Sequence, residues 1–430
     1  MNPVELLRQL IRFDTTNPPG NEAGCIYFIR ELLTEAGVES ELYAKEPRRP
    51  NLVARLPGAA SSPPLLLQGH IDVVTTAGQP WSRPPFSGEL VDGYVWGRGA
   101  LDMKGGVAML VSAFLRAADE RPELPGDVIL AVLSDEEGGG DAGARFLVEE
   151  HAHLFEGVRY GLSEFGGFSH EVGARRFYPI QVAEKQICWL KATIRGPGGH
   201  AAMINRGGTM ARLGRFLSDL DRKRLPVHIT PVAREMVERM AAALRRPQRY
   251  VLRALLKPAL TDRLLPLLGE QRRWFEPLLR NTVSATIVRG GDKINVVPAE
   301  IELELDGRTL PGFGPDALIG ELREVVGTDV ELELVRHDPG PPEPDFALFD
   351  TLAGILRELD PEAIPIPLLQ LGVTDARFFA RLGIQTYGFL PMRLPPDFKF
   401  LGYVHAADER IPADAVEFGA EGIFRALQRF

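Results

Sequence analysis

Short apolar runs in this chain end in acidic or histidine side chains, and this pattern constrains the fold more than any other feature. LLLQG precedes His70 and Asp72, and VILAVLSD precedes the adjacent pair Glu136 and Glu137. Short runs of this kind, bounded by polar residues, are typical of strands buried on both faces of a sheet. In α/β proteins, ligands gather at the carboxyl ends of such strands. The pattern therefore predicts an α/β fold with a site assembled from distant segments.

Three further segments carry candidate site residues. Asp102 lies in GRGALDMKGG, His405 lies in GYVHAADERIP, and Glu164 in GLSEFGG lies between the acidic pair and His405 in sequence. Two adjacent acids at a strand end are unfavourable unless cations neutralise them. Hydrolysis with two metal ions also needs one carboxylate that remains free as a base. We interpret these residues as the ligands and base of a two-metal site, although Glu164 alone would fit a structural role equally well.

The order of expected elements predicts two domains in a chain of 430 residues. Helices at 2–13 and 22–37 precede β-type runs, and a helix at 103–118 separates two of these runs, which implies a sheet covered by helices on both faces. Residues 187–339 read as strand–helix–strand–strand–helix–strand, a smaller α+β domain with a four-stranded antiparallel-type sheet. A leucine- and arginine-rich stretch at about 232–280 is expected to add helices to it. The Pro-rich segment HDPGPPEPD leads back to the first domain, which comprises 1–186 and 340–430.

Charge and composition exclude several classes of partner. The formal net charge is −9 and the pI is about 5.6, which argues against nucleic acid or an anionic membrane as the partner. The N-terminal segment carries charges throughout and reads as an amphipathic helix, neither a signal peptide nor a membrane span. The two cysteines, Cys25 and Cys188, are far apart, so no disulfide framework or cysteine zinc motif is expected. A cytoplasmic location fits these features.

Four motifs in the chain resemble those of zinc metallopeptidase family 20, the di-zinc amidohydrolases. GHIDVV matches the family's G-H-x-D-V-V, and WGRGALDMKGG matches G-R-G-x-x-D-M-K-G-G. SDEEGGG matches S-D-E-E-x-G, and HAADE matches the C-terminal H-x-x-D-E. The family includes aminoacylase, acetylornithine deacetylase, succinyl-diaminopimelate desuccinylase, glutamate carboxypeptidase and dipeptidases of the carnosinase type. The resemblance covers nearly the whole chain and implies a zinc-exopeptidase-like catalytic domain interrupted by a lid domain.

The resemblance also implies a role for each candidate ligand. His70 and Glu164 would bind one metal ion, Glu137 and His405 would bind the other, and Asp102 would bridge them. The expected ions are zinc, with cobalt and manganese as alternatives. In such a site Asp72 would accept the second ring N–H of His70, and Glu136 would act as the general base. A histidine of the lid, His200 in GPGGHAA, would stabilise the tetrahedral oxyanion.

The substrate side is implied in less detail. Asn295 and Arg308 match lid positions that bind the substrate carboxylate, and Asp375 and Arg377 fall in a segment that lines the pocket in relatives. Arg308 could instead form a salt bridge within its own domain. We expect an N-acyl-amino acid or a short peptide with a free C-terminus as substrate. Deacetylase, desuccinylase and di- or tripeptidase or carboxypeptidase activities stay open.

Two departures from the family pattern limit what can be carried over. The insert at about 232–280 enlarges the lid, as in relatives resembling yeast carboxypeptidase S, and it bears on whether the chain forms a homodimer through the lid. Whether His200 acts in its own subunit or across such a dimer is therefore open. A non-catalytic binding protein that keeps the metals would be expected to lose the base or a ligand, and none is missing here. A phosphate loop at GRGALDMKGG is disfavoured by its glycine spacing and neighbouring acids.

Overall fold

The structure is a computed structural model that describes residues 2–341 and 343–430, and contacts divide the chain into two units. Unit 1 comprises Met1–Ala183, Pro344–Leu368 and Thr374–Phe430. Unit 2 comprises Glu184–Glu343 and Leu369–Val373. The domain boundaries expected from the sequence, and the catalytic and lid roles given to the two parts, stay predictions. Each unit is described below by itself.

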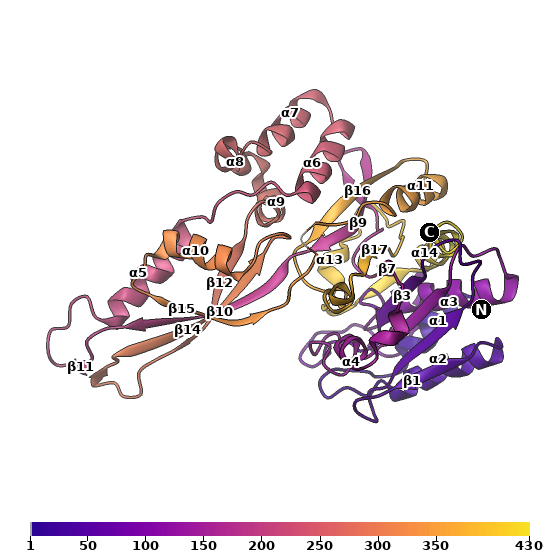
Figure 1. The fold of residues 1–430 in the computed structure, drawn as a ribbon, viewed down its shortest axis with the longest axis horizontal. Helices are drawn as coiled ribbons and strands as arrows, with labels where there is room; N and C mark the ends of the chain where they lie inside the picture. Colours follow the sequence, from indigo (N-terminus) through magenta and orange to yellow (C-terminus); the bar gives the residue numbers. More distant parts are fainter. Residues whose placement is uncertain (1, 342) are drawn as a thin grey trace. The chain divides into compact units, whose positions relative to one another are not determined.

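Unit 1 is built on a nine-stranded mixed sheet with the order β1-β2-β6-β3-β7-β17-β9-β16, in which β8 pairs with β9 (Figure 1). The pairs β3–β6, β3–β7 and β7–β17 are parallel, whereas β1–β2 and β2–β6 are antiparallel. The mixed sheet predicted from the sequence is confirmed. Its strands are β1 Ser40–Tyr43, β2 Asn51–Leu56, β3 Leu65–His70, β6 Val128–Leu133, β7 Tyr160–Ser163, β8 His170–Val172, β9 Arg175–Glu184, β16 Ala363–Gln370 and β17 Gln385–Gly388.

The parallel strands β3, β6 and β7 bring their carboxyl ends to one edge of this sheet. Every residue of β3 and β6 is buried, because both strands lie in the interior of the sheet with helices on either side. Pairing of His70 with Leu133 aligns the ends of β3 and β6. The residues that follow the three strands are therefore neighbours in space although they are distant in sequence.

One face of the sheet packs against helices from both ends of the chain. Helices α1 and α14 contact α3, and α3 contacts β3 and β6. Gly69 of β3 allows this close approach, since a Cβ there would lie 2.5 Å from Cε of Met103. Helix α2 contacts β1 and β2, and α11 contacts α14. These helices are α1 Pro3–Ile11, α2 Ala23–Glu35, α3 Lys104–Glu120, α11 Phe349–Leu359 and α14 Ala413–Ala426.

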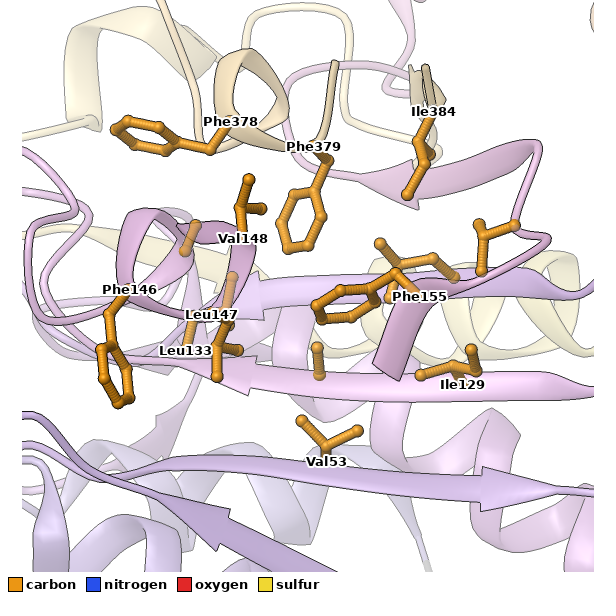
Figure 2. Close-up of a cluster of buried hydrophobic side chains, with 14 residues drawn as sticks. Val53, Ile129, Leu133, Phe146, Leu147, Val148, Phe155, Phe378, Phe379 and Ile384 are labelled. Atoms are coloured by element: carbon orange, nitrogen blue, oxygen red, sulfur yellow. The ribbon is translucent and has the colours of Figure 1, made fainter. Parts of the chain in front are cut away.

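The opposite face packs against α4 and α12, and Figure 2 shows the cluster of buried side chains between them and the sheet. Strand residues at alternate positions, such as Ile129, Ala131 and Leu133 of β6, point into this cluster. Phe155 and Phe379 meet edge to face with ring centroids 5.1 Å apart. Helices thus cover both faces of the sheet, as the sequence predicted. The elements are α4 Ala144–Glu150, the 3₁₀ turn η1 Ala152–Phe155, and α12 Ala376–Phe379.

The start of α3 depends on two glycines. A Cβ at Gly105 would lie 2.1 Å from the carbonyl oxygen of Ala100, and one at Gly106 would lie 2.4 Å from Cδ1 of Leu390. The chain can therefore turn tightly after Asp102 and enter the helix at once. The helix begins one residue later and ends two residues later than the predicted 103–118.

Unit 2 contains a four-stranded antiparallel sheet with the order β12-β14-β10-β15, which confirms the four-stranded sheet predicted for the smaller part of the chain. Helices α5 and α10 pack on it over a separate core that includes Ile194, Phe216 and Leu318. A short ladder, β11 with β13, lies apart from this sheet. The bounds are β10 Gln186–Arg195, β11 Gly199–His200, α5 Thr209–Arg222, β12 Thr282–Arg289, β13 Val296–Val297, β14 Glu300–Thr309, α10 Pro315–Val326 and β15 Glu331–His337.

The stretch between α5 and β12 is helical (Figure 1). Prolines lie in the first turn of three of its helices, because proline fits the first helical turn but interrupts a helix interior. It comprises α6 Pro231–Ala243, α7 Arg246–Leu255, α8 Pro258–Leu264, the 3₁₀ segment η2 Leu265–Gln271 and α9 Arg272–Leu278.

A further small sheet in unit 1 has the order β18-β5-β4. It comprises β4 Glu89–Val91, β5 Tyr94–Trp96 and β18 Arg410–Pro412. The pairing of β18 with β5 brings the segment after His405 beside the segment before Asp102. Across the described residues, every helix is too short or too polar to cross a membrane.

Candidate metal centre

The carboxylate of Asp102 lies between two histidines that come from opposite ends of the chain. Its Oδ1 is 3.2 Å from Nε2 of His70, and its Oδ2 is 3.1 Å from Nε2 of His405. His405 Nε2 is also 3.1 Å from Oε1 of Glu137, and His70 Nε2 is 3.7 Å from Oε2 of Glu164. One carboxylate thus faces two separate groups of donors, each with a histidine and a second carboxylate.

His70 Nε2 is buried and forms no hydrogen bond of acceptable geometry with the residues that the structure describes, although carboxylate oxygens surround it. A buried polar atom without a partner is costly, so its surroundings fit a cation that the ring nitrogen would coordinate. On the other side of the ring, Nδ1 lies 3.0 Å from the main-chain oxygen of Asp72. This contact fixes the ring orientation and turns Nε2 toward the carboxylates, where it would coordinate a cation.

The buried carboxylates of this cluster favour positive charge beside them. Burial opposes a charged ring, yet Asp102, Asp72 and Glu164 raise the pKa of His70 well above its usual value. Asp102 and Glu137 raise the pKa of His405 to about 10. Burial would raise the pKa of Asp102, but the two histidines hold it well below its usual range. The carboxylates of the cluster outnumber its imidazoles, so its net charge is negative, and two divalent cations would neutralise it.

Glu136 and Glu137 leave the end of β6 in a tight turn and point to different donor groups. Donor atoms of His70, Glu136 and Glu164 lie within 4.8 Å of one another, as do those of His70, Asp102 and Glu137. Burial and the nearby Glu164 raise the pKa of Glu136 well above its usual value. Burial also raises the pKa of Glu137, against the opposing effect of His405. A carboxylate with a raised pKa beside a metal group is suited to proton transfer.

Asp72 holds this turn in place through main-chain hydrogen bonds. Its Oδ1 accepts from the backbone N–H of Glu136 and its Oδ2 from that of Glu137, both at 3.1 Å. The carboxylate lies 3.4 Å from His70 Nδ1, farther than the main-chain oxygen of the same residue. The sequence suggested a link from this carboxylate to the His70 ring alone. The structure adds a link to the acidic pair.

Arg98 and Glu409 form a buried pair that the sequence reasoning did not assign to the site. Arg98 Nη1 donates to Glu409 Oε2 at 2.6 Å and to the main-chain oxygen of Ala406 at 3.1 Å. Glu409 Oε1 accepts from the backbone N–H groups of Leu101 and Asp102 at 2.7 and 3.2 Å. The pair therefore ties the Asp102 loop to the loop of His405. Its sequence signal was the last acid of HAADE.

Asp375 and Arg377 pack against the glycines that follow the acidic pair. Arg377 Nη2 donates to the main-chain oxygen of Gly139 at 3.0 Å, and a Cβ at Gly140 would lie 3.1 Å from Asp375 Oδ1. Asp375 is buried, neither of its oxygens has a hydrogen-bond partner among the described residues, and burial raises its pKa to about 7. Both side chains therefore lie in unit 1 beside the turn that carries Glu136.

The other candidate residues lie in unit 2. His200 is exposed on β11, with Nδ1 3.1 Å from the backbone N–H of Ala202. Asn295 is its neighbour, because its main-chain oxygen accepts from the N–H of Ala201 at 3.0 Å. Arg308 binds Asp306 through Nε and Nη2 at 2.7 and 3.2 Å, the salt bridge weighed as an alternative. Its third nitrogen, Nη1, is buried without a hydrogen-bond partner in the part of the chain that the structure describes.

Comparison with known proteins gives a consistent assignment. The model of Peptidase family M20/M25/M40 matches residues 66–429. The chain is 29% identical over 445 residues to succinyl-diaminopimelate desuccinylase of Paracoccus denitrificans, covering 100% of this chain and 98% of the relative. It is 28% identical over 380 residues to the human N-fatty-acyl-amino acid synthase/hydrolase PM20D1, covering 85% of this chain and 74% of the relative.

Among solved structures, the M20 family metallo-carboxypeptidase Sso-CP2 from Sulfolobus solfataricus aligns with a TM-score of 0.68 at 17% identity, over 100% of this chain and 99% of that one. The fold therefore agrees with the sequence match. The chain belongs to Peptidase family M20/M25/M40 and is a hydrolase of that family.

Proposed function

We propose that this hydrolase cleaves the amide bond of N-acyl-amino acids with the help of two divalent metal ions. The observation that carries the proposal is the position of Asp102, whose two oxygens face His70 and His405 at 3.2 and 3.1 Å. A carboxylate placed in this way can bridge two ions. His70 and Glu164 would complete one site, and Glu137 and His405 the other.

The nitrogen and oxygen donors suit zinc, and cobalt and manganese stay alternatives. Two such ions, when bound, supply a Lewis acid for the amide carbonyl and lower the pKa of an attacking water. Glu136 would take the proton from that water and deliver it to the leaving amine. A raised pKa favours this second step, because the protonated acid must be available near neutral pH.

The residues of unit 2 would complete the reaction as the resemblance implies. His200 would donate a hydrogen bond to the developing oxyanion. Arg308, Asn295 or Arg377 would bind the free carboxylate of the substrate, and Arg308 keeps one buried nitrogen available for it. Asp375 would line the same end of the substrate, beside the turn of Glu136. A homodimer formed through unit 2, and a cytoplasmic location, stay predictions.

A small hollow lies beside the proposed metal ligands. Its volume is about 10 Å³, room for about one water molecule, and Asp102 and Glu164 lie in its wall. Phe168 and Phe400 stack there with ring centroids 4.1 Å apart. A space of this size admits no acyl chain, so the hollow does not select among acyl groups. The other lining residues are Leu101, Phe165, Leu390, Met392 and Val404.

The names of the relatives, a desuccinylase and an N-fatty-acyl-amino acid hydrolase, support cleavage of an N-acyl bond and differ in the acyl group.

A substrate panel tests this proposal. The zinc-loaded protein would be assayed with N-acetyl-, N-butanoyl- and N-hexanoyl-leucine, N-succinyl-diaminopimelate and leucine dipeptides. We expect kcat/KM for at least one of the N-acyl substrates to exceed that for the dipeptides by about tenfold or more. Comparison among the N-acyl substrates then identifies the preferred acyl group. Hydrolysis of the dipeptides alone would contradict the assignment.

The Glu136→Gln variant tests the base. We expect kcat to fall by about 10²–10⁴-fold, because the amide cannot accept the proton. Zinc content, measured by atomic absorption, should stay at two ions per chain. Glu137→Gln is the matched comparison, since it should lose a metal ion as well as activity. Full activity in Glu136→Gln would overturn the role of this residue.

A further inference from the structure

Behind the turn of Glu136 lies a buried ionic network that the reaction described above does not use. Arg49 Nη1 is 2.8 Å from Asp135 Oδ1, and Arg49 Nη2 is 2.8 Å from Glu22 Oε1. The side chains of Arg49, Asp135 and Glu22 are 9%, 7% and 0% exposed. Charges buried to this degree interact strongly with their partners and are costly to leave alone.

Asn17 connects this network to the carboxylate that holds the turn. Its Nδ2 donates to Asp135 Oδ1 at 3.0 Å and to Asp72 Oδ2 at 2.8 Å. Asp72 in turn accepts from the backbone N–H groups of Glu136 and Glu137. A continuous path of hydrogen bonds and ion pairs therefore runs from Arg49 to the main chain of the acidic pair.

Asp135 fastens the other end of the same turn. Its Oδ2 accepts from the backbone N–H of Ala142 at 2.8 Å, and its main-chain oxygen accepts from that of Gly140 at 2.6 Å. Asp135 has a φ of +69°, which its short polar side chain tolerates better than most. The turn from 135 to 142 is thus closed by one carboxylate whose cation is Arg49.

Two glycines leave the space that this network occupies. A Cβ at Gly138 would lie 2.3 Å from Asp135 Oδ1 and 2.7 Å from Asn17 Nδ2. A Cβ at Gly20 would lie 2.4 Å from Nε of Arg49. Both contacts are shorter than real Cβ contacts allow, so an alanine at either position would displace the network.

We propose that Arg49 is a positioning residue that, through Asp135, Asn17 and Asp72, sets the main chain of the turn carrying Glu136 and Glu137. This inference rests on the proposed roles of Glu136 as base and Glu137 as metal ligand. A single planar guanidinium serves Glu22 and Asp135 at once, which the ammonium of a lysine cannot do with the same geometry. Small shifts of the turn would therefore reach both the base and a ligand.

The test compares Arg49→Lys and Asn17→Ala with Arg145→Lys. Arg145 is the matched control, because its exposed guanidinium pairs with Asp141 and Glu149 near the same turn. We expect both network variants to lower kcat for N-hexanoyl-leucine by about 10–100-fold with KM changed less than about twofold. Zinc titration of the metal-free protein by calorimetry should show about tenfold weaker binding of one ion. The Arg145→Lys values should match the wild type.

Asn17→Ala keeps every charge of the network, so it tests the same path if Arg49→Lys fails to fold. If folded network variants keep wild-type kcat and zinc affinity, the inference is wrong and Arg49 serves stability only. The Glu136→Gln variant is measured in the same assay. Full activity of that variant would contradict the proposed function and not the inference about Arg49. The zinc titration decides on the inference even in that case, because it does not depend on hydrolysis.

Discussion

Single residues in this protein are predictable from sequence when their chemistry shows in the residues beside them. His70, Asp102 and His405 stand in motifs that end apolar runs, and the structure brings the three side chains together. The sequence did not predict the buried contacts of Asn17, Arg49 and the Arg98–Glu409 pair, because the partners of these side chains are distant in sequence. Nothing near Arg49 in the chain distinguishes it from the exposed arginines.

Lys185 allows a prediction at the same scale. Its ammonium is buried and donates to the main-chain oxygens of Pro277 and Arg280 and to Thr282 Oγ1 at 3.3, 3.0 and 2.9 Å. Burial, with a further effect from Arg308, lowers its pKa to about 7. The unfolded chain, with a lysine pKa near 10.4, binds more protons than the folded one between about pH 7 and 10.

The free energy of unfolding of the wild type should therefore rise with pH in this window relative to Lys185→Met. The slope of the difference is at most about 1.4 kcal/mol per pH unit, and it should flatten below pH 7. Urea unfolding at pH 6, 7, 8 and 9 measures it, and Lys191→Met, which removes an exposed lysine, is the control. A difference between wild type and Lys185→Met that is independent of pH would contradict the shift.

At the scale of elements, long apolar or periodic segments were predicted well and short ones were not. Strands β3 and β6 are continuous apolar runs because the sheet buries both of their faces. Strands β4, β5 and β18 have only three residues each, and their pairing depends on contacts between distant segments. Periodicity cannot reveal an element of that length.

The glycine at the start of α3 supports an element-scale prediction. Gly105→Ala should destabilise the protein by about 1–3 kcal/mol, because the added methyl group would meet the backbone oxygen of Ala100. Gly354→Ala in α11 is the matched control, since nothing lies within 4 Å of its Cβ position. That control should gain about 0.5–1 kcal/mol of helix stability. Thermal unfolding of both variants measures these changes in stability. A Gly105→Ala variant with the stability of the wild type would refute the steric argument.

For the whole molecule, the order of the chain determines which parts could be foreseen. The alternation of strands and helices indicated the mixed sheet, whereas the domain boundary placed at the Pro-rich segment 337–345 stays a prediction. The exact strand order was not predictable, because β9 precedes the unit 2 segment in the sequence and β17 follows it, yet the two strands pair. Pairing between such distant strands leaves no trace in local sequence.

Removal of metal should affect the whole molecule. Chelation with EDTA at pH 7.5 should lower the Tm, because mutually repelling buried carboxylates would lose their counter-charge. The difference in Tm between the zinc-loaded and the metal-free protein should become smaller as the pH falls toward 5.5. Burial raises the pKa of Glu136 and Glu164, so in the metal-free protein these carboxylates take up protons as the pH falls and repel one another less. In the zinc-loaded protein, metal binding weakens as the ligands become protonated. Calorimetric scans measure both states, and a gap that widens on acidification would contradict this account.

The spread of the donor residues has a consequence for how the protein is made. The proposed ligands run from His70 near the start of the chain to His405 close to its end, and unit 2 is synthesised between them. A ribosome-bound chain that has not released its last strand and helix therefore lacks one donor group. Under the proposed ligand roles, tight binding of the second ion therefore requires that the segment around His405 has been synthesised and folded.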